Sequence, residues 1–182
     1  MADDRIRRLA RKIEDLRRKD ETASARRHEI HRQRQEAAER LHKICECFVE
    51  QVNGMIKEDR MMLVPSEFSN EISPEGGADN RMQFMLNVRG RVLLIDLEPP
   101  QSLVSTELFR KPYILQGDVR FFNQELLDDS RVEEHGIFYC PNEGAKDANG
   151  RRTGAWLFWN GRSYKSGPVD DGYLAELMEQ LM

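Results

Sequence analysis

The sequence predicts an α+β protein in which a long N-terminal coiled-coil-like helix leads into a mostly antiparallel sheet packed with helices. Near the N-terminus, apolar residues recur in alternating steps of three and four. Further along, short apolar runs flank turn-forming residues, and the chain ends in a capped amphipathic segment. We therefore divide the 182 residues into a charged helical arm, residues 1–40, and a small α+β domain, residues 41–182, that ends in a C-terminal helix.

The arm is predicted from its apolar spacing and from the absence of helix breakers. The first 60 residues contain no proline and only one glycine, Gly54. Their apolar residues occupy the a and d positions of a heptad repeat, the pattern of a left-handed coiled coil. Asp20, Arg27 and Arg34 interrupt the repeat at a positions. The predicted partner-binding seam consists of Ile6, Leu9, Ile13, Leu16, Ala23 and Ile30.

Three states of the arm fit this pattern. The seam can pair with a second copy and give a homo-oligomer, most simply a dimer, or it can dock as a partner helix on another protein. It can also remain a solvated single helix stabilised by ion pairs one turn apart, such as Glu14–Arg18. We expect self-association, because a lone helix this charged gains little rigidity from propensity alone.

The apolar stripe broadens near residue 41. Leu41, Cys45, Phe48 and Val52 widen the stripe beyond strict a and d positions, which is typical of a helix that packs on a sheet. We expect this helix to kink or end near Asn53-Gly54. We also expect residues 41–182 to fold without the arm.

The domain begins with strand patterns. Residues 61–68 form an expected first strand, broken by Pro65, and two alternating runs then flank Arg89-Gly90. If those two residues are the turn, three cross-strand pairs share one face, as a hairpin against a core requires. The predicted pairs are Leu86 with Leu93, Phe84 with Ile95 and Met82 with Leu97.

The remaining elements are placed by turn and cap residues. We expect strands over residues 113–122 and 137–140, and between them a short helix from Asn123 to His135. Asn160-Gly161, between residues 156–159 and 162–165, predicts a tight hairpin. Asp170 is suited to cap the C-terminal helix.

No motif for catalysis, cofactor binding or metal binding is visible. His42, Cys45 and Cys47 would not converge on a regular helix, and neither of the glycine-rich phosphate-binding patterns occurs. We expect no catalytic residues, no cofactor and no metal. Three cysteines, no secretory segment and no apolar span predict a cytoplasmic protein that contacts no membrane. Arginine outnumbers lysine by 21 to 7, which favours a bacterial origin.

Charge is distributed unevenly along the chain. Residues 1–43 carry a net charge of +5 and the remainder −9. A basic arm and an aromatic hairpin are cues for nucleic-acid binding, but interleaved acids in the arm predict that such binding is weak. The residues that would serve it are Arg17, Arg18, Arg26, Arg27, Trp159 and Arg162.

The sequence therefore favours a non-enzymatic protein-interaction module, such as an adaptor, chaperone or assembly factor. It would oligomerise or dock on another protein through its N-terminal helix. The alternative is a weakly nucleic-acid-associated protein. A third possibility is an enzyme whose site is assembled from residues far apart in the sequence.

Overall fold

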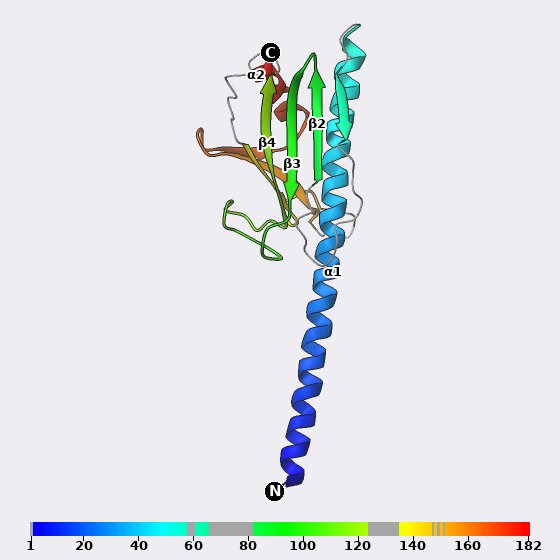
Figure 1. The fold of residues 1–182 in the computed structure, drawn as a ribbon, viewed down its shortest axis with the longest axis vertical. Helices are drawn as coiled ribbons and strands as arrows, with labels where there is room; N and C mark the ends of the chain where they lie inside the picture. Colours follow the sequence, from blue (N-terminus) through cyan, green and yellow to red (C-terminus); the bar gives the residue numbers. More distant parts are fainter. Residues whose placement is uncertain are drawn as a thin grey trace.

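Among the residues that the structure describes, two helices and seven strands make up the fold (Figure 1). The computed structural model describes residues 2–57, 61–65, 82–123, 135–146, 148, 150 and 152–182. The elements in chain order are α1 (Ala2–Met55), β1 (Met62–Pro65), β2 (Met82–Val88), β3 (Arg91–Glu98), β4 (Leu115–Asn123), β5 (His135–Cys140), β6 (Ala155–Asn160), β7 (Lys165–Pro168) and α2 (Asp171–Leu181).

α1 is a single helix of 54 residues. At 1.5 Å per residue it is about 80 Å long, far longer than the body beside it. Figure 1 shows its C-terminal half lying along the sheet and its N-terminal half projecting beyond the body as an arm. The helix ends one residue after Gly54, where the sequence predicts a kink or an end.

The strands form one antiparallel sheet in which each strand pairs with its neighbours in sequence, from β1 to β7. This arrangement confirms the predicted α+β class. The β2–β3 hairpin also confirms the predicted register, since Leu86 pairs with Leu93 and Phe84 with Ile95. Gly90 occupies the turn at a φ of 78°, a conformation that costs glycine little.

The main core lies on the face of the sheet that both helices cover. Alternate residues of the strands point to this face, among them Phe84, Leu93 and Ile95, and they pack against buried residues of α1 and α2. A smaller apolar cluster lies on the opposite face, where Phe109 stacks on Phe138 with ring centroids 4.9 Å apart. The segment between β3 and β4 contributes to this second cluster.

Burial of α1 side chains against the body begins at Ile30. Every described side chain from Asp4 to Glu29 is exposed, whereas Ile30 belongs to the main core. Further along the helix, the indole Nε1 of Trp156 donates to the backbone carbonyl of Ala37 at 2.8 Å. The body therefore includes about ten helix residues that the sequence division assigns to the arm.

Arg34 interrupts the heptad pattern because its side chain forms hydrogen bonds within the body. Its guanidinium is buried, and it donates to the carbonyl oxygen of Ile114 at 2.7 Å and to those of Ser102 and Leu103 at 3.2 Å. Burial lowers the pKa of this guanidinium. One side chain thus fastens the β3–β4 segment to α1.

Two details of the later elements differ from expectation. β6 and β7 do form a hairpin, but its loop is residues 161–164, because Asn160 pairs with Lys165. The Asn160 side-chain oxygen accepts from two backbone amides inside this loop, and Tyr164 has a φ of 55°. The helix expected from Asn123 to His135 lies mostly outside the described residues; His135 itself opens β5 and does not end a helix.

The C-terminal helix begins as predicted. The Asp170 carboxylate accepts from the backbone amide of Tyr173 at 3.0 Å and so caps α2. α2 then buries Leu174, Leu177 and Met178 against the sheet. Its apolar face completes the main core beside α1.

Candidate interaction surface

The projecting arm carries a row of exposed apolar side chains. Ile6 is 65% exposed, and Leu9, Ile13 and Leu16 are each 58% exposed. These four residues lie on one side of α1, one helical turn apart. We call this row the arm seam. No described residue of the chain covers it, so its apolar surface is available to another molecule.

The structure separates the six residues predicted to form the seam. Ala23 is exposed together with the four residues of the arm seam. Ile30 is buried in the main core and contributes to the body. The heptad pattern could not distinguish the two groups, because a sheet and a partner helix both select apolar residues at the same spacing.

A pocket of about 530 Å³ lies where the arm leaves the body. Ala23 and Leu103 supply apolar lining, and all its titratable lining residues are basic. We call this pocket the basic corner; its basic residues are Arg18, Lys19, Arg26 and Arg27. The pocket could not be predicted from the sequence, because it depends on Leu103, which is distant in sequence from the arm.

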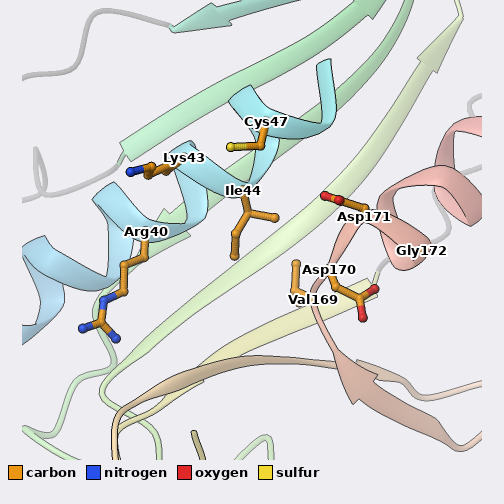
Figure 2. A pocket seen from close by; sticks show the side chains of 8 residues that line it. All are labelled: Arg40, Lys43, Ile44, Cys47, Val169, Asp170, Asp171 and Gly172. Carbon is orange, nitrogen blue, oxygen red and sulfur yellow. The ribbon is translucent and has the colours of Figure 1, made fainter. Parts of the chain in front are cut away.

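A groove of about 640 Å³ separates α1 from the start of α2 (Figure 2). Figure 2 shows Ile44 pointing across it toward Val169, while Lys43 points away from it. The two acids on its α2 side already have structural roles. Asp170 caps α2, and Asp171 accepts from Gln51 at 2.9 Å. The groove therefore lies where the two helices pack together, and both of its acids already accept hydrogen bonds.

A smaller cavity of about 290 Å³ lies between α2 and the β6–β7 hairpin. There the Asn160 amide nitrogen and His135 Nε2 lie 3.2 Å apart, and the Tyr173 ring stacks on Phe158. Burial raises the pKa of the Tyr173 hydroxyl, and this oxygen neither donates nor accepts a hydrogen bond among the described residues. Because the hydroxyl oxygen is itself inaccessible, a ligand in the cavity would not reach it without movement.

The residues proposed for nucleic acid lie in two places. Arg17, Arg18, Arg26 and Arg27 lie on the exposed part of α1, and Arg17 forms an ion pair with Glu21 at 2.9 Å. Trp159 and Arg162 belong to the body hairpin. One ring face of Trp159 lies under the guanidinium of Arg110, 5.7 Å from the ring centroid. The structure thus leaves the Trp159 ring only partly free for base stacking.

The cysteines and histidine that the sequence raised as metal ligands are spread around α1. Cys45 is buried, Cys47 is exposed, and the His42 ring packs edge-on against Phe84. Within the described ranges, no three histidine, cysteine or acidic residues gather closely enough to hold a metal ion. Burial raises the pKa of both Cys45 and Cys140 to about 12. Neither thiol is ionised near neutral pH.

Comparison with known proteins provides no relative. No protein-family model matches the chain, and neither does any curated protein or solved structure. Among the described residues, no helix is both long enough and apolar enough to cross a membrane.

Proposed function

We propose that the protein is a non-enzymatic interaction module that binds a helix of another chain through its arm seam. The exposure of Ile6, Leu9, Ile13 and Leu16 carries this proposal. A row of large apolar residues on a projecting helix is typical of an interaction site. Coiled-coil pairing would bury these side chains between two helices.

The body supplies a rigid base for this arm. From Ile30 onward, α1 is fixed by core packing and by the hydrogen bonds of Arg34. The arm has no such support from the described part of the chain, and an isolated helix in water is only marginally stable. A bound helix would therefore order the arm as well as cover it, as expected of an adaptor, chaperone or assembly factor.

We place this module in the cytoplasm of a bacterium. Its three cysteines are free thiols, two of them buried, which suits a reducing compartment. The excess of arginine over lysine supports a bacterial source.

Photo-crosslinking in the host tests the proposal directly. A photoreactive amino acid is introduced at Leu9 in the arm seam or, as the matched control, at Arg11 on the other side of the same helix. We expect discrete crosslinked adducts from position 9 that position 11 does not give, and their loss when Leu16→Asp is added. Equal crosslinking from both positions, or none from position 9, would contradict a binding role for the seam.

Nucleic-acid binding is the second candidate, and the basic corner is the observation that favours it. That pocket is lined by four basic residues and by no acidic residue. Phosphate groups would be attracted there at low salt. A salt titration of binding to duplex DNA and single-stranded RNA tests this candidate.

A further inference from the structure

The residues that border the arm seam are basic. In a coiled coil, heptad positions e and g flank the seam and contact the partner helix. With Ile6 at position a, the seven flanking positions from residue 5 to residue 26 hold five basic residues, Ala10, Ser24 and no acid. We call the five the basic borders: Arg5, Lys12, Arg17, Lys19 and Arg26.

The acids of the arm lie mostly away from these borders. Glu14, Asp15 and Glu21 occupy b and c positions on the opposite side of the helix. Arg17 is neutralised locally by its 2.9 Å ion pair with Glu21. Across the part of the chain that the structure describes, the other four border residues make no ion pair. Their charges remain available to a partner.

A second copy of this chain is a poor match for such a seam. In a parallel, in-register pair, Lys12 of one copy faces Arg17 of the other, and Asp20 faces its own equivalent inside the seam. In an antiparallel pair the two g borders face one another, and both consist entirely of lysine and arginine. Like charges at these positions oppose pairing, so both arrangements are disfavoured.

The basic corner adds further positive charge where the seam meets the body. Lys19 and Arg26 belong both to a border and to this pocket, and Arg27 lines it from a seam position. A helix lying along the seam toward the body would end against this pocket. Acidic side chains, or the negative C-terminal end of a helix, are the groups that it would favour.

We propose that the occupant of the arm seam is an amphipathic helix of a different protein, with acidic residues on both sides of its apolar face. This inference rests on the proposed function and specifies its partner. Glutamate or aspartate at the e and g positions would pair with the five border residues. The apolar seam provides affinity, and the borders select the acidic helix against a second copy.

The test uses the full chain and three designed helical peptides. The peptides share one apolar seam and carry Glu, Gln or Lys at every e and g position. Binding is measured by fluorescence anisotropy at low and high salt. Five border ion pairs together correspond to a preference on the order of tenfold for the Glu peptide over the Gln peptide. We expect this preference to shrink as salt rises and the Lys peptide to bind most weakly.

Matched charge reversals on the chain test whether the preference for the Glu peptide depends on the border residues. Lys12→Glu with Lys19→Glu changes the borders, whereas Arg8→Glu with Arg11→Glu makes the same charge change at the outward c and f positions. The border variant should lose the preference for the Glu peptide and gain affinity for the Lys peptide. The outward variant should keep the preference of the natural chain.

Four outcomes would overturn the inference. Tight binding that is abolished by Leu9→Asp but is equal for all three peptides would leave the proposed function standing and remove the acidic partner. A stable seam-dependent dimer of the chain at about 1 µM, a concentration at which a weakly matched helix pair should dissociate, would make a second copy the occupant. Binding of single-stranded RNA that falls equally in both charge-reversal variants and exceeds peptide binding would favour nucleic acid. If no peptide binds and the chain stays monomeric, the proposed function fails as well.

Discussion

Arg34 shows how much one side chain can contribute to this fold. Its guanidinium provides hydrogen bonds to three carbonyl groups of the segment between β3 and β4 while it is itself buried. A lysine could not reproduce this arrangement, because a single ammonium lacks the planar fork of donors. The interruption that Arg34 makes in the heptad pattern therefore marks the place where α1 joins the body.

Removing the Arg34 side chain should destabilise the body. Arg34→Ala leaves partly buried carbonyl oxygens without donors, and we expect it to lower the free energy of unfolding by about 2–4 kcal/mol. Arg32→Ala is the control, since Arg32 lies on the exposed side with surface ion pairs to Glu29 and Glu36. The control should cost less than about 1 kcal/mol. Chemical denaturation of both variants measures the difference, and equal losses would contradict the role of Arg34.

The three thiols should react differently in the folded protein. Burial raises the pKa of Cys45 and Cys140 to about 12, so at pH 8 almost none of either thiol is present as thiolate. Cys47 is exposed. We expect a thiol reagent to label one cysteine rapidly at pH 8 and all three after unfolding. In Cys47→Ser the rapid labelling should disappear; rapid labelling that persists in this variant would show that the buried sites open.

At the scale of elements, the boundary between arm and body can be measured by truncation. A chain starting at Glu29 keeps every helix residue that packs in the core, whereas one starting at Leu41 loses Ile30, Arg34 and the carbonyl that accepts from Trp156. We expect the first to melt like the full chain. The second should lose several kcal/mol of stability, since buried apolar contacts and hydrogen bonds are both removed. If the two truncated chains melt alike, the boundary between the arm and the body lies at residue 40.

The elements also show which parts of the fold were accessible from the sequence. Period-two alternation around Arg89-Gly90 fixed the β2–β3 register, because a slip of one residue would turn Phe84 and Leu86 away from the core. The β6–β7 loop was longer than predicted, because Asn160 uses its side chain to cap four turn residues and does not itself enter the turn. Local patterns of this kind act within a few residues, so they identify hairpins better than loop lengths.

The candidate site was only partly predictable for a related reason. Helical spacing identified the exposed residues from Ile6 to Leu16, since that spacing needs no tertiary information. The same spacing included Ile30, which packs on the sheet. The basic corner could not be predicted, because it requires knowing that Leu103 lies beside Arg26 in space. Contacts across such sequence separations are set by the fold as a whole.

At the scale of the whole molecule, charge separates the arm from the body. A net charge of +5 over residues 1–43 accompanies −9 over the remainder. We expect binding to duplex DNA or single-stranded RNA to be weak and to disappear by about 200 mM salt, because few phosphates can be neutralised and the body repels them. A salt titration repeated with Trp159→Ala measures this. Submicromolar affinity near 150–200 mM salt that depends on Trp159 would make nucleic acid the leading ligand.

Hydrogen exchange tests the central claim, that the arm is a binding helix completed by another chain. The side chains of residues 4–28 are all exposed and none packs in the core, so the amides of these residues should exchange rapidly, whereas those from Ile30 onward in α1 should be protected. Saturation with the Glu peptide should protect residues 4–28 and leave the body unchanged. Peptide-induced protection confined to the body, or none at all, would contradict the assignment of the arm as the binding surface.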